Sequence, residues 1–295
     1  MKPVFGLRAH DFGTFAAAEL APQIALSGAT CVQLALAKAL PGAHLLPSEF
    51  GEAGIAEIRQ AFNNNGISIA VLGCYIDMVT PDLHEREFSL ARFAAHIEAA
   101  AALGCRIIGT ETGSPIPYLD RADGREVAFN IALESLQQLV KVAEEKGVVV
   151  GVEPVAEFHA LSSAEHARMM IDKFNSVAVG IIFDPVNLVP VKGVADMNAF
   201  LDECFAAFGD HIIAIHAKDY QMIRGENGLV KSDALPAGMG DMDWEGLFLR
   251  LIKVGKHQVP ILLEEAGPNE APAAFARLNI AWDNAVEKAR MIMNF

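Results

Sequence analysis

Short apolar runs alternate with longer amphipathic stretches along the whole chain. Several runs are β-branched and continuous, which is typical of strands buried on both faces of a parallel sheet. The stretches between them have helical period, as in Arg86–Leu103 and Arg125–Lys146. The pattern predicts eight strands, at Val4–Leu7, Cys31–Leu36, Ile67–Leu72, Arg106–Gly109, Val148–Glu153, Ala178–Asp184, Ile212–His216 and Ile261–Glu264.

Glycines stand at the ends of several predicted helices. Gly66, Gly104 and Gly147 each stand between a predicted helix and the next strand, where a glycine C-cap belongs. Eight strand–helix units in 295 residues predict an α/β fold, a single (β/α)8 TIM barrel spanning residues 1–295. The alternative is an open doubly wound sheet, but its G-x-G-x-x-G marker is missing from the first turn, which reads LRAHDFG.

Composition narrows the class of protein. Apolar residues make up 52% of the chain and charged residues 20%, which excludes intrinsic disorder. Asp and Glu number 37 against 23 Lys and Arg, a formal charge of −14. Because binding to nucleic acid needs a basic surface and none is visible, we expect no nucleic-acid partner. Clustered carboxylates suit a hard metal cation or a neutral polyol.

The chain carries no signal for export or membrane insertion. The N-terminal MKPVFGLRAHDFG lacks a long apolar stretch, and no apolar run reaches the roughly 18 residues of a membrane span. The four cysteines are scattered and form no C-x-x-C pair, which is typical of buried thiols in a reducing compartment. We therefore expect a cytoplasmic protein with no membrane partner.

Polar residues stand at the ends of the last four predicted strands. The fifth ends at Glu153, the sixth at Asp184, the seventh at His216 and the eighth at Glu264 and Glu265. Barrel enzymes place their active sites at the carboxyl ends of the strands. Four adjacent strands that all end in a chemically active group therefore predict a site there.

The alternation of side chains along a strand tests this prediction. On the fifth to seventh strands the bulky residues fall on the face opposite the polar one; Ile213 and Ile215, for example, oppose His216. Bulky residues suit the face that packs on the helices, so the polar ends of these three strands should point into the barrel mouth. The eighth strand is ambiguous, because Leu262 and Leu263 are equally apolar.

Carboxylates and an imidazole converging from neighbouring strands form a site of mixed oxygen and nitrogen character. Such a site fits one divalent metal ion, Mn²⁺, Mg²⁺ or Co²⁺, and also Zn²⁺. The alternative is that each residue only bonds a helix N-terminus or a neighbouring loop.

With these residues identified, the chain resembles the xylose-isomerase-like TIM-barrel superfamily, which includes ketose 3-epimerases, hydroxypyruvate isomerase and inosose dehydratase. The resemblance rests on the strand-end glutamates, on F-D-P-x-N-L and H-x-K-D, and on GMGDMDW before the last part of the chain. It implies that Glu153, Asp184, His216 and Glu264 are metal ligands, with Glu264 preferred over Glu265. It also implies that Glu153 and Glu264 act as the catalytic acid–base pair.

The resemblance is imperfect around these ligands. Many epimerases have His where this chain has Asn187, and their second glutamate is matched only loosely, by Glu157 or His159. The arginine that usually follows the strand-seven His is represented only by Arg224. Together with residues of the first and fourth turns and the lysine of H-x-K-D, these give the expected substrate-binding set: Arg8, His10, Glu111, Glu157, His159, Asn187, Lys218 and Arg224.

The longest connection runs over residues 218–242, after the seventh strand. It contains four glycines and a mixture of charges, with too little apolar content to form core. Long connections in compact domains are usually functional. We expect this one to cover the barrel mouth and exclude water, the alternative being a surface excursion away from the site.

The combined expectation is a divalent-metal-dependent isomerase or epimerase of a small sugar, ketose or keto acid, acting through a metal-stabilised enediolate. The main alternative is a lyase, an inosose-type dehydratase that starts from the same intermediate. A non-catalytic sugar-binding barrel is a weaker alternative, as is an apurinic-site endonuclease, which would need histidine at Asn187 and a less acidic chain. The expected partner is a small sugar or polyol, with further copies of the chain if it assembles as a homo-oligomer.

Overall fold

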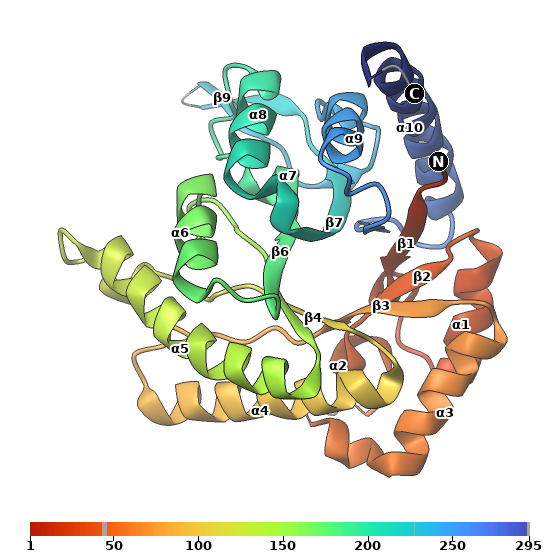
Figure 1. The fold of residues 1–295 in the computed structure, drawn as a ribbon, viewed down its shortest axis with the longest axis vertical. Helices are drawn as coiled ribbons and strands as arrows, with labels where there is room; N and C mark the ends of the chain where they lie inside the picture. Colours follow the sequence, from red (N-terminus) through yellow and green to blue (C-terminus); the bar gives the residue numbers. More distant parts are fainter. Residues whose placement is uncertain (43–45, 227, 294–295) are drawn as a thin grey trace.

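The computed structural model describes residues 1–42, 46–226 and 228–293. Its eight predicted strands are all present, are parallel, and close into a barrel in the order β1-β2-β3-β4-β5-β6-β7-β11, with β11 paired back to β1 (Figure 1). Their bounds are β1 Val4–Arg8, β2 Cys31–Leu34, β3 Ser68–Gly73, β4 Ile107–Thr110, β5 Val149–Val152, β6 Val179–Phe183, β7 Ile212–Asp219 and β11 Pro260–Leu263.

A long helix follows every barrel strand and packs outside the barrel, so the (β/α)8 prediction is confirmed. The predicted glycine caps are also confirmed, since Gly66, Gly104 and Gly147 all have φ between 66° and 75°. The outer helices are α1 Ala17–Leu26, α3 Gly51–Asn64, α4 Leu83–Leu103, α5 Gly124–Lys146, α6 Ala164–Phe174, α8 Met197–Phe208, α9 Trp244–Lys253 and α10 Ala271–Met293, and the short turns are α2 Leu36–Ala39, α7 Pro185–Leu188, η1 Ala9–Phe12, η2 Pro47–Phe50, η3 Ile116–Tyr118 and η4 Gly209–His211.

Two strand ends differ from prediction by more than one residue. Strand β2 ends at Leu34, before the predicted Leu36, because the following Leu-Ala-Lys-Ala forms the helical turn α2. These residues are good helix formers, and an apolar run alone does not distinguish a strand from a helix. Strand β7 continues past the predicted His216 to Asp219, because β10 (Leu235–Pro236) pairs antiparallel with its last two residues.

The barrel interior confirms the predicted facing of the polar strand ends. A small apolar cluster fills the interior, and it includes Ile182, Ala214 and Leu262. Each of these residues precedes a polar strand-end residue by two positions, so Asp184, His216 and Glu264 continue the inward face. The structure thus resolves the facing of the eighth strand, which the sequence left open.

Ile213 was predicted to face the helices, and this is wrong. The pairing of β6 with β7 runs Ile181 to Ile212 and then Ile182 to Ala214, so Ile213 is an extra, bulged residue. The Ile213 side chain lies over Gly180 and Gly151. A Cβ added to Gly180 would come within 2.7 Å of this side chain, and a Cβ added to Gly151 would come within 3.2 Å of it. The two glycines therefore make room for Ile213 on the inner side of the barrel.

The connection over residues 218–242 is partly structured. It contains a two-stranded antiparallel hairpin, β8 Met222–Gly225 and β9 Gly228–Lys231, and position 227 lies outside the described residues. The buried Asp219 carboxylate accepts hydrogen bonds from Gly238 N at 2.8 Å, Met242 N at 3.0 Å and Trp244 Nε1 at 3.2 Å. The H-x-K-D and GMGDMDW motifs thus meet, and they fix the start and end of the connection to β7.

Within the described residues, no helix is both long and apolar enough to cross a bilayer.

Candidate active site

Four buried side chains meet at the carboxyl ends of neighbouring strands. Glu153 follows β5, Asp184 follows β6, His216 lies in β7 and Glu264 follows β11. Each is 4% exposed or less. The sequence predicted these residues as one site, and the structure brings them together.

His216 lies at the centre of this group. Its Nδ1 is 3.1 Å from Glu153 Oε2 and 3.4 Å from Glu264 Oε1. Ligand atoms from Glu153, Asp184 and His216 lie within 4.8 Å of one another. Glu264 joins the group through its contact with His216, so both glutamates approach the same ring nitrogen from strands on either side of it.

Lys218 extends the group along β7. Its Nζ lies 2.7 Å from Asp184 Oδ2 and 2.7 Å from Glu264 Oε2. The side chain is 8% exposed and lies on the same face of the strand as His216. Lys218, predicted to contact substrate, therefore contacts two of the predicted ligands. We call Glu153, Asp184, His216, Lys218 and Glu264 the mouth cluster.

The side-chain amide of the buried Gln33 hydrogen-bonds His216. Gln33 Nε2 donates to Tyr75 Oη at 2.6 Å, which turns Gln33 Oε1 toward His216 Nε2 at 2.8 Å. Since that oxygen can only accept, His216 Nε2 carries a proton, and the lone pair of the neutral ring is on Nδ1. Sequence reasoning missed Gln33 and Tyr75. The available signal was a polar residue inside the apolar run CVQLAL.

Asn187 orients two of the carboxylates. Its Nδ2 donates to Glu153 Oε1 at 2.6 Å, and its backbone N–H donates to Asp184 Oδ1 at 2.9 Å. Asp184 caps the short helix α7, which has Pro185 at its first position. Asn187 was predicted to bind substrate, and the structure places it against the cluster.

The turn after β1 adds an arginine. Arg8 Nε is 2.8 Å from Asp11 Oδ1, and its Nη1 is 3.4 Å from Glu264 Oε1. Its Nη2 is 2.9 Å from the carboxylate of Glu265, which is 46% exposed and has φ of +55°. Of the two adjacent glutamates, Glu264 thus belongs to the cluster, and Glu265 lies outside it. His10 lies in the same turn, and burial together with the Arg8 charge lowers its pKa to about 4.

The close charges shift the pKa values of the cluster. Burial disfavours the His216 cation, but the Glu264 and Glu153 carboxylates outweigh burial and raise its pKa to about 9. Burial likewise opposes ionisation of Glu153 and Glu264, yet the His216 and Lys218 charges hold both pKa values below the usual range. At Asp184 burial prevails, and the pKa is raised.

The remaining predicted contacts divide into two groups. Glu111 and His159 face each other at the rim, with His159 Nε2 3.7 Å from Glu111 Oε2. Burial, reinforced by the Glu153 and Glu264 charges, raises the pKa of Glu111 to about 7. Glu157 instead accepts from Val191 N at 3.3 Å, and Arg224 is exposed on β8. Of the two loose matches to the epimerases' second glutamate, His159 is therefore the one that faces another site candidate.

The cluster has the chemistry of a divalent-cation site. Asp184 Oδ2 and His216 Nδ1 are buried, and their neighbours are the charged groups of the cluster: Lys218 Nζ lies 2.7 Å from Asp184, and the two glutamates lie 3.1 and 3.4 Å from His216. Two or three carboxylates and a neutral imidazole nitrogen form a donor set that suits Mn²⁺, Mg²⁺, Co²⁺ or Zn²⁺. The residues therefore fit the predicted metal, with Glu153, Asp184 and His216 nearest one another.

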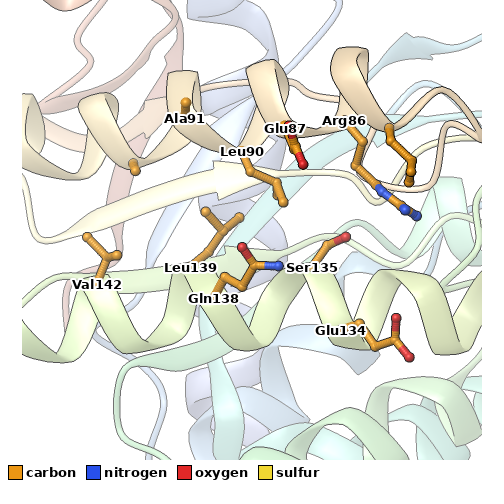
Figure 2. A pocket seen from close by; sticks show the side chains of 11 residues that line it. Arg86, Glu87, Leu90, Ala91, Glu134, Ser135, Gln138, Leu139 and Val142 are labelled. Carbon is orange, nitrogen blue, oxygen red and sulfur yellow. The ribbon is translucent and has the colours of Figure 1, made fainter.

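A hollow on the outside of the barrel has a different character from the mouth cluster. It measures about 420 Å³ and lies between α4 and α5, outside the barrel (Figure 2). Its walls mix apolar side chains such as Leu90 and Leu139 with Arg86, Glu87 and Glu134. No residue of the mouth cluster lines it, so the predicted chemistry belongs to the barrel mouth.

Solved structures align over nearly the whole chain at low identity. A D-tagatose 3-epimerase-like protein has 17% identity and a TM-score of 0.74, covering 96% of this chain and 98% of its own. L-ribulose 3-epimerase has 14% identity and a TM-score of 0.74, covering 99% and 98%. The IOLI protein, solved with a zinc atom, has 14% identity and a TM-score of 0.71, covering 97% and 98%. No curated protein sequence matches the chain.

These likenesses establish the fold rather than the reaction. The family model of the xylose isomerase-like TIM barrel matches residues 22–283, which is most of the chain. The resemblance predicted from the strand-end motifs is thereby confirmed, and the chain belongs to the xylose isomerase-like TIM barrel family.

Proposed function

We propose that the protein is a divalent-metal-dependent isomerase or epimerase of a small sugar, ketose or keto acid. The observation that carries the proposal is the approach of Glu153 and Glu264 to one buried nitrogen, His216 Nδ1, from two different strands. Two carboxylates held on either side of one point can take and return a proton on two faces of a bound substrate. The epimerases among the structural neighbours support the same reaction class.

In this proposal Glu153, Asp184, His216 and Glu264 would hold the cation. When bound, it would polarise the substrate carbonyl and stabilise the enediolate. Glu153 and Glu264 would exchange the proton at the adjacent carbon, while Asn187 orients the Glu153 carboxylate and Gln33 fixes the His216 tautomer. Arg8, His10, Glu111 and His159 stand around the cluster as candidates for holding the substrate.

The proposal extends to the surroundings of the site. The hairpin of β8 and β9 would serve as a cover at the β6–β7 side of the mouth, because Lys231 Nζ donates to the carbonyls of Val186 and Val189, each at 2.7 Å. The binding partner would be a small polyol. The compartment would be the cytoplasm, because four scattered cysteines suit a reducing environment.

Solvent proton exchange tests the proposal. The chelator-treated protein, reloaded with Mn²⁺, Mg²⁺ or Co²⁺, is incubated in D₂O with a panel of ketoses and keto acids, and incorporation of deuterium at carbon is followed by NMR. We expect exchange with at least one compound, and its loss when a chelator is added. Exchange that persists in excess chelator would contradict the role of the metal.

A dehydratase is the second candidate, and Glu111 is the observation that favours it. With a pKa of about 7, this carboxyl is partly protonated at neutral pH and can donate a proton to a departing hydroxyl. The same NMR experiment distinguishes the two reactions, because a dehydratase releases an unsaturated product or its keto tautomer, whereas an epimerase conserves the substrate's formula.

A further inference from the structure

An ammonium group lies inside the carboxylate cluster. Lys218 Nζ is 2.7 Å from one oxygen of Asp184 and 2.7 Å from one oxygen of Glu264. Lysine is almost never buried without a partner, and here it has two. One oxygen of each of these carboxylates is therefore engaged by a charge that belongs to the protein itself.

The backbone around Lys218 is firmly held. Strand β10 pairs with it, Pro236 lying opposite Lys218 and Leu235 opposite Asp219. The neighbouring Asp219 carboxylate accepts hydrogen bonds from Gly238, Met242 and Trp244. Because these contacts fix the direction of the strand, the lysine stem enters the barrel mouth beside His216.

The charges of the cluster define what Lys218 does. Glu153, Asp184 and Glu264 supply three negative charges, and Lys218 supplies a positive charge in contact with two of them. Without a metal, the His216 cation adds positive charge beside Glu153 and Glu264, and Arg8 adds positive charge beside Glu264. Positive charge at this place lowers the attraction of the carboxylates for any further cation, and the effect is strong because the cluster is buried.

We propose that Lys218 is a resident cation that sets the metal affinity of the mouth cluster. It neutralises Asp184 and Glu264, stabilises the cluster without a metal, and competes with a divalent cation for the same two carboxylates. The inference rests on the proposed metal site and adds to it a reason for moderate affinity and ready exchange of the metal.

Calorimetric titration of the chelator-treated, full-length protein with MnCl₂ tests the proposal. Lys218→Met keeps the apolar stem and removes the charge, and Lys218→Gln is a second neutral variant in case the first does not fold. We expect the Mn²⁺ Kd to fall by about tenfold or more, equivalent to at least ~1.4 kcal/mol. Without metal, the neutral variants should melt at a lower temperature than wild type, and Mn²⁺ should raise their Tm more.

Lys231→Met is the matched control. This variant removes the same charge from the same rim, but Lys231 Nζ donates to the carbonyls of Val186 and Val189 and forms no ion pair with a carboxylate among the described residues. Its Mn²⁺ Kd should stay within about threefold of wild type, far below the tenfold step expected for Lys218. Lys218→Arg, which keeps the charge, should also bind close to wild type.

The outcomes separate the two proposals. If wild type binds Mn²⁺ and the neutral Lys218 variants bind equally or more weakly, the resident-cation role is overturned while the metal site stands. If neither wild type nor any variant binds Mn²⁺, Mg²⁺, Co²⁺ or Zn²⁺, the metal site of the proposed function is overturned as well. Tighter binding in the Lys218 variants alone supports the proposal.

Discussion

The two halves of the barrel mouth do different work. Strands β5, β6, β7 and β11 end in a dense group of charged residues, in which every member contacts another. Strands β1, β2 and β4 end in residues that approach this group from outside: Arg8 pairs with Glu264, Gln33 bonds His216, and Glu111 faces His159 at the rim. The second half thus supplies the charged cluster, and the first half orients its members and shapes the surroundings.

The difference follows from how the charges are buried. In the second half, three carboxylates are compensated by Lys218 and His216 at contact distance. In the first half His216 is oriented by neutral groups, a side-chain amide and a phenol, and Arg8 adds a positive charge 3.4 Å from Glu264. A buried amide costs little when both of its ends are bonded, whereas a buried carboxylate requires a cation. Substitutions in the two halves should therefore have effects of different size.

The largest effect is expected in the second half. Glu153→Gln and Glu264→Gln should each lower kcat by roughly 10²–10⁴-fold, because a base acts in the transition state, while KM changes far less. Glu265→Gln is the matched control next in sequence, an exposed glutamate outside the cluster. It should lose less than about tenfold, short of the loss expected for a base. A Glu264 variant with full turnover would remove the two-glutamate mechanism.

The contrast between the halves also explains what the sequence could predict. The barrel follows from eight buried runs, and the second half from polar residues at the ends of four of them. The pairing of Lys218 with both Asp184 and Glu264 could not be predicted, because strand parity gives the face of a side chain and not the reach of a long one. Gln33 could not be assigned either, since its partners lie on β7 and after β3.

Irregularities of the backbone set a second limit. The bulge at Ile213 cannot be seen in the sequence, because the apolar run HIIAIH is compatible with a regular strand and with a bulged one. The hairpin of β8 and β9 was predicted only as a long connection, because its strands are four residues long and have no alternation of buried apolar and exposed polar residues; Ile223 and Leu229 are exposed. Both features depend on contacts between strands rather than on local sequence.

A smaller effect is expected from the first half, at Gln33. Gln33→Leu removes the acceptor for His216 Nε2, which frees the tautomer and the ring orientation. Residues that orient a metal ligand typically contribute about 10–100-fold to metal affinity or activity. We expect a loss of that size in Mn²⁺ affinity, measured by calorimetry.

Thr110→Val provides the control for Gln33. It removes a buried hydroxyl at the end of β4 that bonds the Glu111 carbonyl and does not contact His216. Its Mn²⁺ affinity should match that of wild type. An equal loss in both variants would mean that the effect of Gln33→Leu is general destabilisation.

The next prediction concerns the hairpin of β8 and β9 as a cover between the proposed site and solvent. Replacing residues 224–229 by Asn-Gly, a favoured two-residue turn, shortens the hairpin and leaves Lys231 and Asp219 in place. If the hairpin covers the bound substrate, KM should rise by up to about tenfold, or ~1.4 kcal/mol. The measurement is steady-state kinetics on the substrate found by proton exchange. Unchanged KM and kcat would show that the hairpin is a surface excursion.

The smallest effect is expected at Glu111, and it depends on pH. Burial, together with the charges of Glu153 and Glu264, raises its pKa from 4.5 to about 7 in the folded protein. As the pH rises between these values, the unfolded chain releases this proton while the folded chain retains it, so the free energy of unfolding falls and stays lower above pH 7.

Glu111→Gln does not titrate and avoids this loss. We therefore expect its Tm to exceed that of wild type by a few degrees at pH 8, where roughly 1 kcal/mol corresponds to about 2–4 °C in a chain of this size class. The advantage should disappear near pH 4, where both states of wild type are protonated. Calorimetric scans in chelator at the two pH values measure the difference, and a Tm difference that is equal at both, or larger at pH 4, would contradict the burial of a titrating carboxyl at the rim.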